Sequence, residues 1–224
     1  MLLSWPQWEF LLRGMMVTLG VALLAFPMAL LVAFFAGLSL LSRLWVVRMI
    51  ATTYIEIFRG TSALVQIFFV FFVLPLFDIE LPPIVAGVLA LGMNFGAYGA
   101  HIVRSTIQSV DRGQWEVASA LNMPHALAMR RIILPQAIIV MIPLFGNEFI
   151  RILKATALLS VVTVPELTFS GKILVGHTGL PGAVYSAVLI IYFATSFPLA
   201  MGVRWLEARI QSRFGVVPMH AREG

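Results

Sequence analysis

The residues from Gly14 to Leu41 form an apolar run that contains no charged side chain. A transmembrane helix needs about 20 such residues, so this run is long enough to cross a bilayer. The whole chain has the same character, because 60% of its 224 residues are hydrophobic, 11% are charged and its mean hydropathy is +0.97. A soluble domain has about 25% charged residues and could not bury this much apolar surface. We therefore expect an all-α membrane protein that forms a single domain over residues 1–224.

Long apolar segments predict about five membrane-spanning helices. Their approximate bounds are 8–41, 61–77, 84–103, 132–153 and 183–203. The third segment carries Gly92 and Gly96 in the small-xxx-small spacing that lets two helices approach closely. Residues 155–182 are also apolar, but prolines and glycines interrupt them. For that segment we expect a short helix that enters the membrane from one face without crossing it.

The basic residues gather on one side of this predicted topology. The first loop, the polar segment 104–131 and the C-terminal tail together hold eleven Lys or Arg residues, whereas the opposite side holds four. Because Lys and Arg favour the cytoplasmic side, the polar segment and the C-terminus are expected inside the cell and the N-terminus outside. This distribution also accounts for the net charge of +5. Contact with membrane lipid is therefore expected, and contact with nucleic acid is not.

Residue types that form catalytic and metal sites are scarce. The chain has no cysteine, its four histidines lie far apart, and it has no HExxH sequence. It also lacks a GxxxxGK[ST] loop whose backbone amides could hold phosphates. We therefore expect no catalytic residue, no metal and no cofactor, which disfavours an intramembrane enzyme.

The polar segment 104–131 is patterned. Residues 115–121 can form a short helix rich in small side chains, which would let another surface come close. Asn122 then stands where a helix ends in the left-handed conformation, and Pro124 stands where the next helix would start. Two short helices that meet at a tight corner would form a rigid knob suited to a partner's groove. An amphipathic loop lying on lipid is the alternative interpretation.

The sequence around this knob, DRGQWEVASALNMPHALAMRRIILP, resembles the cytoplasmic motif of permease subunits of bacterial ATP-binding cassette importers, which runs Glu-Ala-Ala, then Gly, then Ile-x-Leu-Pro. Val117 replaces the second motif residue and Asn122 replaces the glycine. By this resemblance, the residues that couple to the ATPase are Glu116, Ala118, Leu121, Asn122, Ile132, Leu134 and Pro135.

The resemblance covers nearly the whole chain and is closest to the polar amino acid uptake branch, the histidine, glutamine and arginine permease type. Three long segments carry it: EIFRGTSALVQIFF at 56–69, MNFGAYGAHIVRSTIQSVDRGQWE at 93–116 and IPLFGNEFIRILKATALLSVVTVPEL at 142–167. It implies the type I ABC importer permease fold in a bacterial inner membrane. The implied partners are two ATP-binding cassette ATPase subunits, a second permease subunit (a copy or a paralogue) and an extracytoplasmic solute-binding protein. ATP would be hydrolysed on the ATPase subunits.

Polar side chains recur at helical spacing inside two predicted spans. Asn94, Tyr98 and His101 share one face of the third span. The fourth span carries a second set, formed by Asn147, Glu148, Arg151 and Lys154. Such groups are costly at membrane depth unless they face a cavity or pair with one another. A neighbouring acid and base could meet both ends of a zwitterionic solute, so we expect a substrate pathway here. Hydrogen bonds between helices and a structural ion pair are the alternatives.

Four residues begin the second predicted span from the cytoplasmic side: Glu56, Arg59, Gly60 and Thr61. Their expected exposure predicts a gate or a subunit contact, and a solvated salt bridge is the alternative.

Other functions and solutes stay open at this point. A secondary transporter driven by an ion gradient would also use broken helices and buried charges, but five spans without an internal repeat disfavour it for a lone chain. Related importers carry opines or ectoine-type compatible solutes, and no residue here separates these from a polar amino acid.

Overall fold

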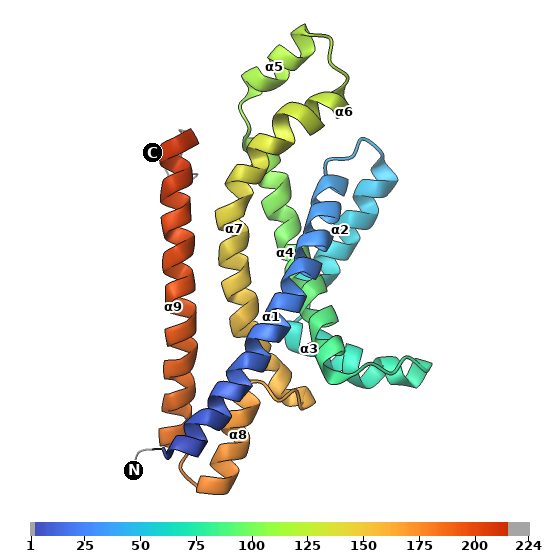
Figure 1. The fold of residues 1–224 in the computed structure, drawn as a ribbon. Coiled ribbons are helices and arrows are strands. Elements are labelled where there is room, and N and C mark those ends of the chain that lie inside the picture. The colour runs from blue at the N-terminus through green and yellow to red at the C-terminus, as the bar shows by residue number, and fades with distance from the viewer. Residues whose placement is uncertain (1–2, 215–224) are drawn as a thin grey trace.

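The computed structural model describes residues 3–214, which fold as helices joined by short turns (Figure 1). Four helical segments are long and apolar enough to cross a membrane, and a bent pair can form a fifth. This confirms an all-α membrane protein with about five spans. The elements are α1 (Trp5–Ser39), α2 (Trp45–Gly60), α3 (Ala63–Phe68), η1 (Phe69–Val73), η2 (Leu74–Phe77), α4 (Pro83–Ser109), α5 (Arg112–Ala120), α6 (His125–Ala128), η3 (Met129–Ile133), α7 (Leu134–Ala155), η4 (Thr156–Val162), α8 (Leu167–Thr178) and α9 (Pro181–Phe214).

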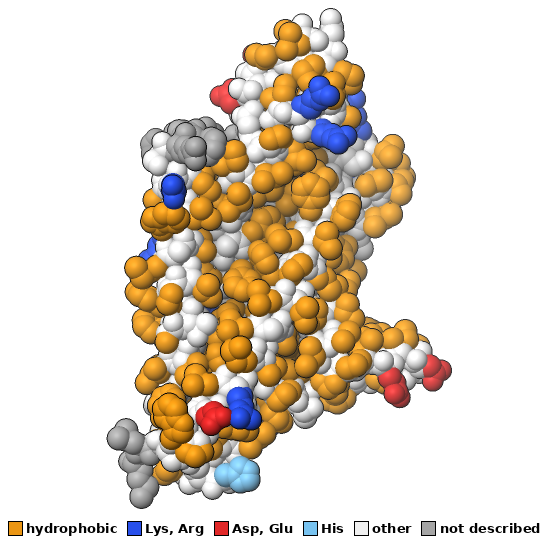
Figure 2. Space-filling view, in the orientation of Figure 1, with side chains coloured by type: hydrophobic (Ala, Val, Ile, Leu, Met, Phe, Trp, Pro, Cys, Tyr) orange, Lys and Arg blue, Asp and Glu red, His pale blue; other side chains and the backbone are white. Residues whose placement is uncertain are grey.

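Helices α1 and α4 form the centre of the bundle, and small residues let them pack closely. A Cβ atom on Gly96 would lie 2.6 Å from Val32 Cγ1, and one on Gly92 would lie 2.8 Å from Met28 Cγ. The predicted close approach at these two glycines is therefore confirmed. The outer surface is mostly hydrophobic, with its charged side chains concentrated toward the ends, as the face in Figure 2 shows. Such a surface suits a lipid environment.

The predicted second span, residues 61–77, does not form a membrane-spanning helix by itself. Helix α2 and the helical segment Ala63–Phe77 meet at a bend of 101° and can together form one broken span. Residues 45–60, which the sequence predicted to be a polar loop, form the 16-residue helix α2, and Ala51 and Ile55 are buried along it. The polar residues of α2 lie on its exposed face, so its mean hydropathy is too low to mark a span.

The segment after α7 contains a short helix, as predicted. Helix α8 has 12 residues, about 18 Å at 1.5 Å per residue, which is too short to cross. Glu166 caps it, because its Oε1 accepts from Phe169 N at 2.7 Å and its Oε2 accepts from Thr168 N at 2.8 Å. Tyr192 of α9 donates its hydroxyl to Oε2 at 3.1 Å. This fully buried carboxylate therefore joins α8 to α9.

Candidate functional site

Tyr98 of α4 lies close to two guanidinium groups from different helices. The Cζ of Arg59 in α2 lies 5.4 Å from the centre of the Tyr98 ring, and the Cζ of Arg151 in α7 lies 5.5 Å from it. Both distances are within the range for attraction between a cation and an aromatic face. Residues from three helices thus form one cluster, which we call the arginine–tyrosine cluster: Arg59, Tyr98, His101, Glu148 and Arg151.

His101 holds Arg59 in this cluster. The Nη1 of Arg59 lies 3.0 Å from His101 Nε2. Arginine only donates hydrogen bonds, so Nε2 must accept and the imidazole must be neutral in this contact. The sequence analysis assigned Arg59 to a gate or subunit contact, whereas the structure brings it beside the predicted pathway residues. The break after α2 explains this, because it carries the end of α2 into the bundle.

Glu148 and Arg151 pair as their spacing predicts, with Arg151 Nη1 2.8 Å from Glu148 Oε2. Glu148 is 2% exposed, and its Oε1 has no hydrogen-bond partner within residues 3–214. Arg151 is exposed, as are Asn147 and Lys154 on the same face of α7. The cluster therefore presents cationic donors toward an open side of the chain, whereas Glu148 Oε1 is buried behind them.

Asn94 has a different environment from the rest of the predicted pathway. It is 4% exposed, and its Nδ2 donates to Phe58 O at 3.0 Å and to Gln66 Oε1 at 3.1 Å. Gln66 Nε2 in turn donates to Phe58 O at 2.9 Å and to Thr61 Oγ1 at 2.7 Å. These amides satisfy the carbonyl that the helix break leaves free. The geometry favours the alternative interpretation of Asn94, a hydrogen bond between helices, and the sequence analysis missed Gln66.

The remaining predicted gate residues lie around the same break. Thr61 Oγ1 donates to Ile57 O at 2.7 Å. Glu56 and Gly60 are exposed on α2. A Cβ atom added at Gly60 would have no neighbouring atom within 4 Å.

The polar segment folds into the knob that the sequence predicted, and it projects beyond the ends of the long helices (Figure 1). Asn122 ends α5 in the left-handed conformation with a φ of 51°, and Pro124 precedes α6. Met123 N donates to Ala118 O at 3.0 Å, which closes the corner. The rings of Trp115 and His125 stack at 4.9 Å across the two short helices. The corner is therefore held by a backbone hydrogen bond and by a stacked pair of rings.

The predicted coupling residues divide into exposed and buried ones. Glu116, Leu121, Asn122 and Pro135 are exposed, and Leu121 is 67% exposed. Ile132 and Leu134 are half-buried at the base of the knob. Ala118 is 1% exposed, so its methyl group packs inside the knob and can shape it but cannot touch a partner directly.

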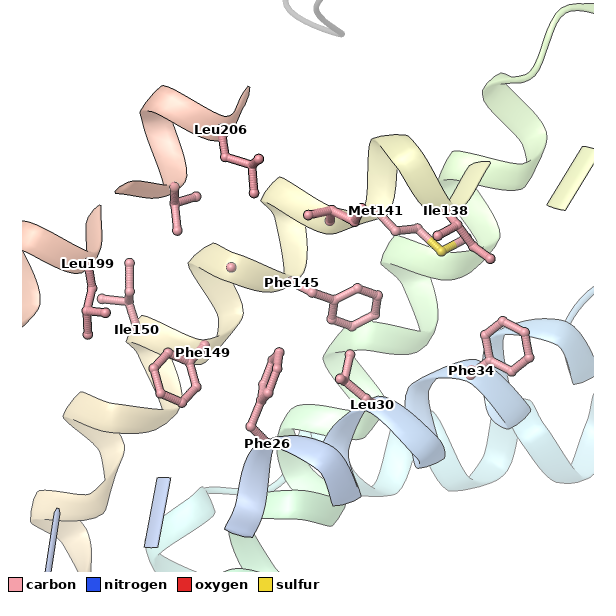
Figure 3. A pocket seen from close by; sticks show the side chains of 13 residues that line it. Phe26, Leu30, Phe34, Ile138, Met141, Phe145, Phe149, Ile150, Leu199 and Leu206 are labelled. Carbon is pink, nitrogen blue, oxygen red and sulfur yellow. The ribbon is translucent and has the colours of Figure 1, made fainter. Parts of the chain in front are cut away.

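A separate groove of about 550 Å³ lies between α1, α7 and α9 (Figure 3). Its lining is apolar and includes Phe26, Phe145 and Leu206. On α7, this groove and the exposed residues Asn147 and Arg151 lie on roughly opposite faces at 100° per residue. The groove offers no polar group to a solute, so it is distinct from the arginine–tyrosine cluster.

Residues 25–212 match the family of binding-protein-dependent transport system inner membrane components. The chain belongs to this family. A probable amino-acid ABC transporter permease protein of Sinorhizobium fredii is 42% identical over 88% of this chain and 86% of its own length. The glutamine transport system permease protein of Escherichia coli is 32% identical over 92% of this chain and 95% of its own length.

A solved structure of an amino acid ABC transporter with histidines superimposes with a TM-score of 0.85 at 37% identity, covering 90% of this permease and 94% of the solved chain. Structures of the MetNI methionine ABC transporter, such as one at 17% identity and a TM-score of 0.78, share the fold. The chain is therefore a permease subunit with the type I importer fold, and its role is transport.

Proposed function

We propose that this permease carries a small zwitterionic solute of the polar amino acid type past the arginine–tyrosine cluster, driven by ATP hydrolysis on separate subunits. The observation that carries the proposal is the convergence of Arg59, Tyr98 and Arg151 from three helices next to a buried Glu148. A guanidinium can hold the solute carboxylate through paired hydrogen bonds, and the negative charge of Glu148 beside Arg151 favours its ammonium group. Asn147 and Lys154 extend the same face of α7.

Two ATPase subunits dock on the knob formed by α5 and α6, one on each permease of a pair. Glu116 and the exposed apolar side chain of Leu121 make the contact, while Asn122 and Ala118 keep the corner in shape. The pair is completed by a second permease subunit, and an extracytoplasmic protein delivers the solute at the opposite end. This assignment places the knob and the C-terminus in the cytoplasm and the N-terminus outside, in agreement with the distribution of basic residues.

Uptake by the assembled importer in proteoliposomes tests the site. Glu148→Gln and Arg151→Gln should each lower ATP-dependent uptake at least tenfold while ATPase subunits stay bound. Arg13→Gln is a matched control, because Arg13 forms an exposed ion pair of 2.7 Å with Glu9 on α1, away from the cluster. Normal uptake and specificity in both cluster variants would overturn the assignment.

The knob is tested by assembly. Leu121→Arg should release the ATPase from purified permease or uncouple ATP hydrolysis from uptake. Leu44→Arg is the control, since Leu44 is 68% exposed and lies in the turn between α1 and α2. Unchanged binding and coupling in the Leu121 variant would contradict the docking role. Uptake that follows an ion gradient without ATP would instead favour a secondary transporter.

A further inference from the structure

The arginine–tyrosine cluster carries more positive charge than one zwitterionic solute can neutralise. Arg59 uses one of its five N–H groups, for His101, and no carboxylate in residues 3–214 lies within ion-pair distance of it. Lys154 likewise makes no ion pair among the described residues. Arg151 is the cation of the cluster that has a carboxylate partner, Glu148.

The charges around His101 do not correct this excess. Among the described residues, Glu56 is the one carboxylate that acts electrostatically on His101, against both Arg59 and Arg104, so the surroundings of His101 stay cationic. His101 itself is neutral while it accepts from Arg59. Arg59 and Lys154 are left as cations without a counter-charge.

The two guanidiniums lie close enough for one small molecule to touch both. Their Cζ atoms are 5.4 and 5.5 Å from the same ring centre, so they are at most about 11 Å apart. Arg59, Arg151 and Glu148 together carry one excess positive charge, and a zwitterionic solute adds no net charge, so the excess remains when such a solute binds. A second carboxylate on the same solute supplies the negative charge that offsets this excess.

We infer that the cluster selects amino acids that carry a second carboxylate over neutral or cationic ones, an inference that rests on the proposed function. A cationic side chain would meet Arg59 and Lys154 and be repelled. A neutral amide of the same size as a carboxylate fills the same space but leaves the Arg59 charge unpaired. Discrimination therefore depends on charge and not on solute size.

Glutamate and glutamine provide the test, because they have nearly the same shape and differ by one charge. The complex of permease and ATPase, without a solute-binding protein, is placed in nanodiscs, and equilibrium binding of both radiolabelled amino acids and of lysine is measured. We expect glutamate to bind at least tenfold more tightly than glutamine and lysine to bind most weakly, with a preference that falls as salt rises.

Substitutions at Arg59 test whether this residue causes the preference for glutamate over glutamine. Arg59→Gln should bring the glutamate-to-glutamine ratio close to one, Arg59→Lys should keep most of it, and Arg13→Gln should leave it unchanged. Equal or tighter binding of glutamine, or no binding of any of the three solutes, overturns the inference. ATP-dependent uptake with a binding protein is measured on the same complex: if it is present while glutamine is preferred, the charge selection fails and the proposed function stands.

Discussion

A substitution at Asn94 can distinguish a structural role of this residue from a solute-binding role. The Asn94→Ala substitution removes two hydrogen bonds at a site that is 4% exposed, to Phe58 O at 3.0 Å and to Gln66 Oε1 at 3.1 Å. Hydrogen bonds between membrane helices contribute about 0.6 kcal/mol each on average. The half-buried Oε1 of Gln66, left without this donor, adds about 1 kcal/mol to the cost. We expect the free energy of unfolding to fall by about 2 kcal/mol.

The assay is unfolding in mixed micelles with increasing denaturing detergent, combined with solute uptake. Asn94→Ala should lower the unfolding midpoint while the KM for uptake per folded molecule stays unchanged. In a double-mutant cycle with Gln66→Ala, the loss should be less than additive because the two side chains share one network.

Gln136→Ala is the matched control for this prediction. Gln136 Nε2 donates to Gln114 Oε1 at 3.3 Å in an exposed pair of amides. Its removal should cost less than about 0.5 kcal/mol. Wild-type stability of Asn94→Ala together with a raised KM would refute the reasoning and return Asn94 to the solute pathway.

Substitutions at three more positions test the packing, the cap of α8 and the corner of the knob. Gly96→Ala should lower the free energy of unfolding by about 1–3 kcal/mol, because its Cβ would lie 2.6 Å from Val32 Cγ1; thermal denaturation in detergent measures it. Tyr192→Phe should cost about 1 kcal/mol in the same assay by removing the hydroxyl that donates to Glu166. Asn122→Val should weaken coupling between ATPase activity and uptake, and Asn122→Gly should not, because only glycine and asparagine adopt a φ of 51° readily.

The sequence predicts the long spans because their signal is local and strong. The apolar run that forms α1 needs no partner to be recognised, and the corner at Asn122 follows from the chemistry of one residue that tolerates the left-handed conformation. The pair Glu148 and Arg151 is also local, since three residues separate them on one helix.

The broken span could not be predicted in the same way. The charged side chains of α2, Arg48, Glu56 and Arg59, lower its mean hydropathy, so hydropathy assigns it to a loop. Its buried Ala51 and Ile55 are recognised only once α4 is beside it. The amides of Asn94 and Gln66 that hold the break come from two other helices. Sequence spacing within one helix carries no information on such contacts, so Arg59 was placed apart from Tyr98.

The connection between the knob and the arginine–tyrosine cluster is continuous helix. From His125 to Val162 the chain runs without a loop, so about 26 residues, or about 39 Å at 1.5 Å per residue, join the start of α6 to Arg151. Arg59 lies on α2, which contacts α4 but has no covalent path of this kind to the knob. Helix α4, which carries Tyr98 and His101, also joins the knob, through Val110 and Asp111. A displacement of the knob is therefore transmitted to Arg151 through α7 and to Tyr98 through α4, whereas it reaches Arg59 only through the contacts of α2 with its neighbours.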